Sequence, residues 1–144
     1  MERLAGQVAV VTGGGTGMGE AAAAALARAG ARVVVVGRRP EPLDEVVRYL
    51  TEEGRTALAR PIDVTDSDAV EDLVAEVTQR WGQVDVLVNS AGINVPRRDL
   101  ASVSVADWHA VRQINLTGTF LMTRAVLPIM RRQRSGTIVN VSSI

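Results

Sequence analysis

The sequence contains no cysteine and no lysine among its 144 residues. The first absence excludes disulfides, thiolate metal sites and a cysteine nucleophile, and we expect no metal site. The second absence means that all sixteen basic residues are arginine. A Schiff base, a P-loop lysine or a lysine that lowers a tyrosine pKa therefore cannot operate within these residues.

The sequence also has no net charge and no long apolar run. Sixteen basic residues balance sixteen acidic ones, so the charge gives no reason to expect nucleic acid or an anionic membrane as a partner. No apolar run approaches a membrane span, and Met1-Glu2-Arg3-Leu4 does not resemble a signal peptide. With 47% hydrophobic residues the chain is globular, and we expect one domain over residues 1–144, located in the cytoplasm.

Apolar, β-branched runs alternate with helical patterns along the chain. We expect strands at residues 7–12, 32–37, 57–62, 84–89 and 137–142. We expect helices near residues 17–29, 40–53, 67–81 and 104–132, the last of them bent at Pro128. Near-continuous apolar strands separated by helices predict an α/β fold of the Rossmann type, with a parallel sheet between two helical layers. Right-handed crossovers give the strand order 3-2-1-4-5.

Five glycines within seven positions separate the first strand from an alanine-rich helix. Glycines let the backbone turn tightly and approach a pyrophosphate, which the N–H groups at the helix start can then bind. An ordinary strand–helix turn is the alternative, but the position between strand and helix favours a dinucleotide site. The predicted phosphate-binding residues are Gly13, Gly15, Thr16, Gly17, Met18 and Gly19.

The second strand ends at Gly37, followed by Arg38 and Arg39, where an NAD-binding unit usually has a carboxylate for the ribose hydroxyls. Without that acid a 2′-phosphate is not repelled, and a guanidinium can bind it with two parallel hydrogen bonds. We therefore favour NADP(H) as cofactor, with NAD(H) as a possibility. Two solvated arginines are the alternative. The missing acid also argues against a methyltransferase.

Further candidates follow the third and fourth strands, whose carboxyl ends meet at the ligand-binding edge of such a sheet. Asp63 is placed to accept a hydrogen bond from an adenine amino group, although a turn or helix-cap role competes and Asp66 suits the cap better. Asn89, Ala91 and Gly92 are small or polar residues that let a cofactor lie close.

The long helix and the last strand carry the remaining candidates. Asn115 lies within an apolar stripe, where a purely structural hydrogen bond competes with a catalytic role. His109 is expected on the solvated side of the helix. The arginines within residues 131–134 are expected to interact with the last carbonyls of the helix rather than with an anion. A hydroxyl at the end of the last strand, such as that of Ser143, points to the cofactor edge, although a serine that closes a strand is common in any case.

Taken together, these segments resemble the short-chain dehydrogenase/reductase family. The pieces that match in order and spacing are Thr12-Gly13-x-x-x-Gly17-x-Gly19, Asp63-Val64, Asp85-x-Leu87-Val88-Asn89-Ser90-Ala91-Gly92, Asn115-Leu116-x-Gly118 and Gly136-x-Ile138-Val139-Asn140-Val141-Ser142-Ser143. The resemblance implies a Rossmann fold and hydride transfer between nicotinamide and an alcohol or carbonyl carbon of a small molecule.

The resemblance also implies roles for individual residues. Gly13, Gly17 and Gly19 would form the phosphate loop, Asp63 and Val64 would contact the adenine, and Arg38 would select NADP. Asn89 and Gly92 belong to the motif that closes the fourth strand. Asn115 would be the catalytic asparagine, and Ser143 the serine that hydrogen-bonds the substrate oxygen. Met18 and Ser90 depart from the usual family residues, and neither change is expected to abolish binding.

The Tyr-x-x-x-Lys pair of the family is not found in these residues, since the only tyrosine, Tyr49, is followed four positions later by Glu53. The chain therefore looks like the cofactor-binding portion of a reductase without the C-terminal part of the family fold. We expect it to be inactive alone, and to form homo-oligomers through helix 104–132, as family members often do. A non-catalytic nucleotide-binding module is the alternative function.

Overall fold

The computed structural model describes residues 2–143. Its elements, in chain order, are β1 (Val8–Thr12), α1 (Gly17–Arg28), β2 (Arg32–Gly37), α2 (Pro40–Glu52), β3 (Ala57–Pro61), α3 (Ser67–Trp81), β4 (Val86–Asn89), α4 (Val105–Arg112), the π-helical segment η1 (Gln113–Gly118), α5 (Thr119–Gln133) and β5 (Thr137–Asn140). Every expected strand is present, with its ends within two residues of the expected positions.

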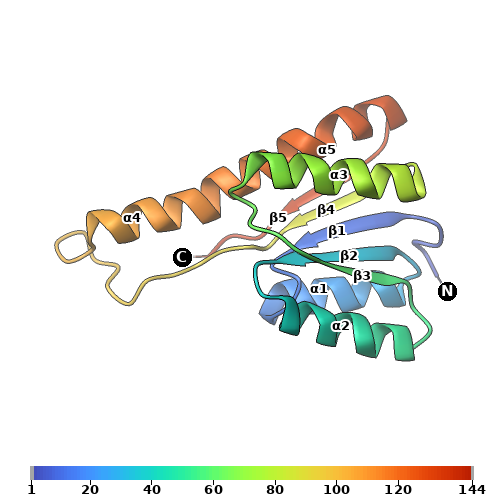
Figure 1. Ribbon diagram of the computed structural model, residues 1–144, viewed down its shortest axis with the longest axis horizontal. Coiled ribbons are helices and arrows are strands. Elements are labelled where there is room, and N and C mark those ends of the chain that lie inside the picture. Colours follow the sequence, from blue (N-terminus) through green and yellow to red (C-terminus); the bar gives the residue numbers. More distant parts are fainter. Residues whose placement is uncertain (1, 144) are drawn as a thin grey trace.

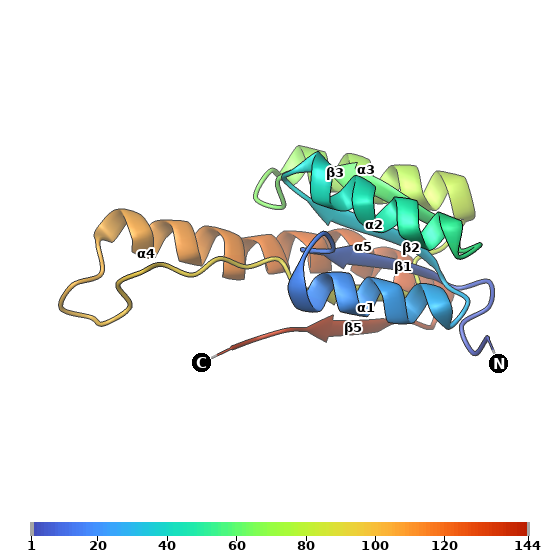
Figure 2. The same cartoon turned by 90° about the horizontal axis from the view of Figure 1, so that it is seen from below.

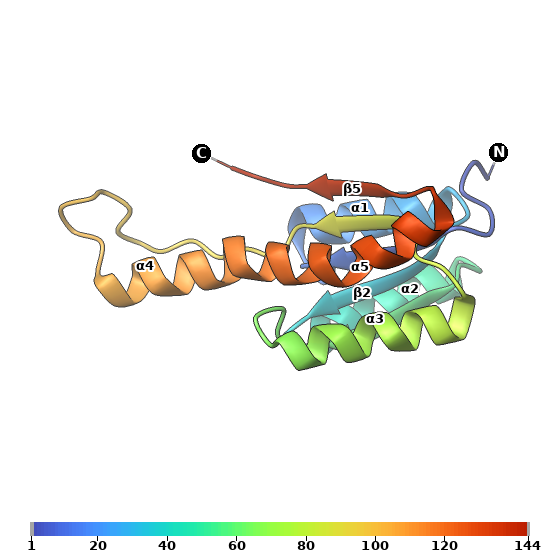
Figure 3. The ribbon, with the colours of Figure 1, turned by 90° about the horizontal axis from the view of Figure 1, so that it is seen from above.

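The five strands form one parallel sheet in the order β3-β2-β1-β4-β5, which confirms the expected topology. Helices α1 and α2 cover one face of the sheet, and α3 and α5 cover the other (Figure 1). The views from below and from above show each helical layer in front of the sheet in turn (Figures 2 and 3). All five residues of β1 are buried because both of its faces are covered.

Alternating side chains of β1 divide the apolar core into two layers. Val8 and Val10 pack with residues of α3 and α5, whereas Ala9 and Val11 pack with residues of α1 and α2. Ala23 and Ala27 of α1 are fully buried in the second layer. Small side chains at these positions let α1 lie close to the sheet, and this holds the start of α1 against the carboxyl end of β1.

The long helix differs from the expected regular helix over residues 104–132. Its middle, η1, is π-helical, and α5 continues through Pro128, so the departure from α-helical geometry lies about Asn115. Beyond the sheet the helix continues as α4, none of whose described residues is buried (Figures 1 and 2). No helix in the described part of the chain, this one included, is both long enough and apolar enough to cross a membrane.

Gly118, at the end of η1, fixes the approach of the long helix to the loop after β3. A Cβ at this position would lie 2.6 Å from Cγ2 of Val64, well inside van der Waals contact. Only a glycine therefore allows the helix backbone to come this close to Val64, a residue that is itself 6% exposed.

Candidate functional site

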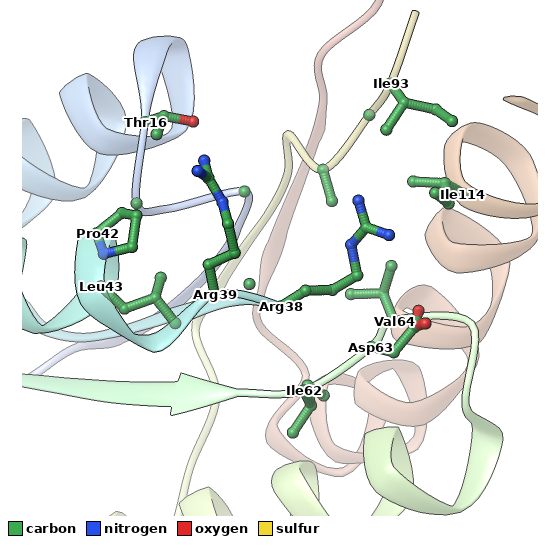
Figure 4. A pocket seen from close by; sticks show the side chains of 15 residues that line it. Thr16, Arg38, Arg39, Pro42, Leu43, Ile62, Asp63, Val64, Ile93 and Ile114 are labelled. Carbon is green, nitrogen blue, oxygen red and sulfur yellow. The ribbon is translucent and has the colours of Figure 1, made fainter.

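A cavity of about 460 Å³ lies where the carboxyl ends of β1, β2, β3 and β4 meet (Figure 4). This is the edge at which parallel α/β sheets bind ligands. The lining residues are Gly13, Gly15, Thr16, Gly37, Arg38, Arg39, Pro42, Leu43, Ile62, Asp63, Val64, Ala91, Gly92, Ile93 and Ile114.

The structure brings most of the predicted cofactor residues to this cavity. Those that line it are Gly13, Gly15, Thr16, Arg38, Arg39, Asp63, Val64, Ala91 and Gly92. Gly17, Met18 and Gly19 begin α1 next to Thr16, and Met18 is 66% exposed. The lining residues that sequence reasoning missed are mainly apolar, namely Pro42, Leu43, Ile62 and Ile114. Their pattern in the sequence is that of ordinary core positions, so nothing marked them as parts of a site.

The glycine loop lies directly against the segment that follows β4. Gly13 has a φ of +64°, and a Cβ there would lie 2.7 Å from the carbonyl oxygen of Ser90. The buried hydroxyl of Thr12 accepts hydrogen bonds from the backbone N–H groups of Ser90 and Ala91, each at 3.1 Å. These contacts hold the glycine loop and the end of β4 together as one wall of the cavity.

Arg38 and Arg39 both line the cavity and are both exposed. Arg39 is the N-cap residue of α2, with an extended backbone, and Pro40 occupies the first turn of that helix. In Figure 4 the side chain of Arg39 extends toward Thr16, whereas that of Arg38 extends over Val64. The cavity therefore has two guanidinium groups at its β2 side.

Asp66 is the helix cap, as expected, whereas Asp63 makes the turn contact that was the alternative to an adenine contact, and its adenine role stays a prediction. The Asp66 carboxylate caps α3 by accepting hydrogen bonds from two backbone N–H groups of its first turn. The Asp63 carboxylate accepts hydrogen bonds from N–H and Oγ1 of Thr65, at 2.9 and 2.8 Å. These bonds, with a smaller effect of the Arg38 charge, lower the pKa of Asp63 below its ordinary value. Asp63 is therefore ionised at neutral pH and remains a hydrogen-bond acceptor in the cavity wall.

Asn89 is buried, with 3% of its surface exposed, and is not among the lining residues. Its Nδ2 donates to Oδ1 of Asn140 at 2.9 Å and to Oγ1 of Thr123 at 3.3 Å. Its Oδ1 has no hydrogen-bond partner within residues 2–143. The Asn89 side chain thus joins β4 to β5 and α5. It lies inside the fold and not in the cavity wall, where the sequence had placed it.

A protein-family model described as short chain dehydrogenase matches residues 7–144. The chain belongs to the short-chain dehydrogenase family. It is 41% identical over 140 residues to 2,3-dihydro-2,3-dihydroxybenzoate dehydrogenase of Bacillus subtilis, covering 97% of this chain and 53% of that protein. It is 45% identical over 143 residues to cis-4-hydroxycyclohexanecarboxylate dehydrogenase of Sinomonas cyclohexanicum, covering 99% of this chain and 57% of that one.

Solved short-chain dehydrogenase structures share the fold. A metagenomic short-chain oxidoreductase in complex with NADP superimposes with a TM-score of 0.93 at 39% identity, over 99% of this chain and 64% of its own. The structure of a "putative short-chain dehydrogenase/reductase" from Burkholderia xenovorans gives a TM-score of 0.94 at 40% identity, over 98% of this chain and 57% of that one. The chain thus spans about half the length of the curated relatives it matches.

The two catalytic candidates, Asn115 and Ser143, do not line the cavity. Asn115 lies in η1 and is exposed, whereas the sequence suggested a buried amide. Both ends of its side-chain amide bond the backbone of Ile93: Oδ1 accepts from the Ile93 N–H at 2.8 Å, and Nδ2 donates to the Ile93 carbonyl at 3.0 Å. The Asn115 side chain thus ties the helix to the loop after β4, and its catalytic role stays a prediction. Ser143 is exposed and follows the end of β5 by three residues. His109 is exposed beside Arg112, on the solvated side as expected.

Proposed function

We propose that residues 1–144 form the NADP(H)-binding portion of an oxidoreductase that acts on an alcohol or carbonyl group of a small molecule. The observation that carries the proposal is the cavity at the strand ends, which combines a glycine loop, two arginines after β2 and the ionised Asp63. When bound, the nicotinamide of such a cofactor gives or accepts the hydride.

The residues present fit each part of that cofactor. Thr16, the N-cap of α1, makes no capping hydrogen bond with its side chain in the described structure, which leaves the N–H groups of the first turn for a pyrophosphate. Asp63 offers an acceptor to an adenine amino group between Ile62 and Val64. The absence of an acid in residues 37–40 favours a 2′-phosphate over a free ribose hydroxyl.

We expect residues 1–144 alone to bind cofactor without reducing a carbonyl. Tyr49 lies in α2, where its hydroxyl donates to Oε1 of Glu20 at 3.4 Å and its pKa is raised, chiefly by burial. It is not among the lining residues of the cavity, and a phenol with a raised pKa is a poor general acid at neutral pH. The same geometry favours the second candidate function, a non-catalytic nucleotide-binding module. NADPH oxidation by the purified chain with a carbonyl substrate would exclude that module.

A fluorescence titration of the purified chain with NADPH, and in parallel with NADH, tests the proposed cofactor. We expect saturable binding of both coenzymes, with the lower Kd for NADPH. Equal affinities would contradict the choice of NADP(H), and binding of neither would contradict the proposed function as a whole.

Self-association through the long helix stays a prediction. Leu116 and Phe120, 63% and 57% exposed, lie on a mainly apolar groove of about 520 Å³ along α5. We propose a second copy of the chain as the occupant of this groove, because the resemblance to short-chain dehydrogenases implies that this helix packs in a dimer interface.

A further inference from the structure

A groove lies on the outer surface of the helical layer formed by α3 and α5. The two helices lie side by side over the same face of the sheet (Figures 1 and 3). The groove runs between residues 67–79 of α3 and residues 121–132 of α5, and we call it the α3–α5 groove. Its volume of about 640 Å³ is larger than that of the cavity at the strand ends, and the two share no lining residue.

The floor of the α3–α5 groove is apolar. Val70, Val74 and Ile129 line the groove and are buried. At Ala75 and Ala125, which also line it, the side chains end at Cβ, and this keeps space open between the two helices. Apolar side chains from outside the chain can therefore reach the floor and be removed from water there.

The side of the groove formed by α5 is basic. No acidic residue follows Asp107, whereas five of the sixteen arginines do, so the zero net charge conceals a basic segment. Arg124 and Arg132 belong to this segment, line the groove and are exposed. Arg124 lies 3.8 Å from Glu71 on the α3 side, in an exposed ion pair of small effect. Arg132 makes no hydrogen bond or ion pair within residues 2–143, although the sequence predicted an interaction with the last helix carbonyls.

The length of the groove and the spacing of its arginines match a helix. Residues 67 and 79 are twelve positions apart on α3, which corresponds to about 18 Å, or roughly three helical turns. Arg124 and Arg132 are eight positions apart on α5, which corresponds to about 12 Å. Two acids seven or eight positions apart on another helix have nearly the same spacing and lie on one edge, because they are about two turns apart.

We propose that the α3–α5 groove binds an amphipathic helix of another protein, with its apolar face on the groove floor and acids on one edge paired with Arg124 and Arg132. The bound helix carries apolar residues at positions i, i+3 or i+4, and i+7, as helices bound in grooves do. Its two acids are seven or eight positions apart. The site is separate from the cavity at the strand ends, so the proposal does not rest on the proposed cofactor.

A second copy of this chain does not supply such a helix. Within the described residues only α2 and α3 carry two or more acids, and both bury their apolar side chains in the core of their own chain. Helix α4 leaves Val105 and Trp108 exposed, but its one acid is Asp107 and it ends at Arg112. The occupant is therefore a different protein.

Fluorescence anisotropy with two labelled peptides tests the proposal. Both peptides are alanine-rich helices of roughly 18 residues, a length that is helical in water, and both have the same leucine face. One carries glutamates seven positions apart on the edge, and the other carries lysines there. The variant Arg132→Glu is compared with the control Arg131→Glu. Arg131 is exposed next to Arg132 but lines the groove on the other side of α5, so the two variants change the net charge equally.

We expect the wild-type chain to bind the glutamate peptide saturably and the lysine peptide roughly 10-fold more weakly. Arg132→Glu should weaken binding of the glutamate peptide roughly 3- to 10-fold and strengthen binding of the lysine peptide, whereas Arg131→Glu should change neither. Glu71→Gln should strengthen binding of the glutamate peptide roughly 2- to 5-fold, because it releases Arg124 from its ion pair. NADPH binding should be the same in all of these variants.

Equal binding of the two peptides, or equal losses in Arg132→Glu and Arg131→Glu, would overturn the proposal, because the basic side of the groove would then not select its ligand. Binding of dodecanoate without binding of either peptide would overturn it in favour of a small amphiphilic anion. Self-association that sedimentation shows to be lost in Arg132→Glu, again without peptide binding, would overturn it in favour of a second copy. A wild-type chain that binds neither peptide would overturn it as well, whereas the NADPH titration tests the proposed function separately.

Discussion

Replacing Gly13 with alanine tests the contact on which the cavity wall depends. Gly13 has a φ of +64°, and a Cβ at this position would lie 2.7 Å from the carbonyl oxygen of Ser90 and 2.9 Å from N of Ala91. Both neighbours are backbone atoms, so no flexible side chain can move aside. The alanine must distort either the glycine loop or the segment after β4.

The free-energy change follows from two contributions. A residue with a Cβ in the left-handed region costs about 1–2 kcal/mol relative to glycine. Moving the backbone of Ser90 and Ala91 away from Gly13 would weaken their two hydrogen bonds to Thr12, worth roughly 0.5–1.5 kcal/mol each. Together these give a destabilisation of roughly 2–5 kcal/mol, a large part of the ~5–15 kcal/mol that stabilises a typical domain.

Urea unfolding followed by circular dichroism measures this loss, and Gly54→Ala is the matched control. Gly54 has a similar φ of +76°, but a Cβ there would meet nothing within 4 Å. The control should therefore lose only about 1–2 kcal/mol, the contribution of the backbone conformation. We also expect Gly13→Ala to bind NADPH more weakly under conditions in which it is folded, while Gly54→Ala binds it normally. If the two variants are equally stable, the close approach to Ser90 does not constrain the fold and the reasoning is refuted.

Three further changes test other parts of the structure. Asn115→Ala removes two hydrogen bonds to the loop after β4 and should destabilise that loop by about 1–2 kcal/mol, seen as faster amide hydrogen exchange there and unchanged exchange in β1. Glu76→Gln removes the ion pair with Arg60, which lowers the pKa of Glu76; it should cost about 0.5–1 kcal/mol at pH 7. That difference should shrink as the pH falls below about 4.3, because protonation of Glu76 breaks the pair in the wild-type chain too, and a constant difference would contradict the ion-pair explanation. Phe120→Asp should lower any dimer fraction measured by sedimentation, whereas the control Leu100→Asp, at an exposed loop residue, should not; equal effects would count against α5 as the interface.

Much of the fold was predictable because it depends on local patterns. The apolar runs that became β1 and β2 are buried on both faces, so their sequence has little freedom, and right-handed crossovers leave few strand orders. The separation of Asp63 from Asp66 was also predictable, since a helix cap has a fixed position relative to the first helical turn.

Other features depend on contacts between distant segments, which a sequence pattern does not encode. The residues of η1 are compatible with an ordinary α-helix. The bonds of Asn115 to Ile93 and the approach of Gly118 to Val64, which accompany the π-helical turn, become visible only in three dimensions. The direction of the Asn89 side chain likewise depends on the pairing of β4 with β5. Sequence reasoning placed Asn89 in the right segment but could not tell which side of the sheet its amide would face.

The contact between Gly118 and Val64 also sets the position of the whole helix along its own axis. A displacement by one residue would bring Thr117 or Thr119 against Val64, and either side chain would overlap Val64, because even a Cβ at Gly118 would lie 2.6 Å from its Cγ2. The contact between Gly118 and Val64 thus fixes the register of the helix against the loop after β3. Because Val64 also lines the cavity, the residue that sets the position of the long helix is at the same time part of the cavity wall.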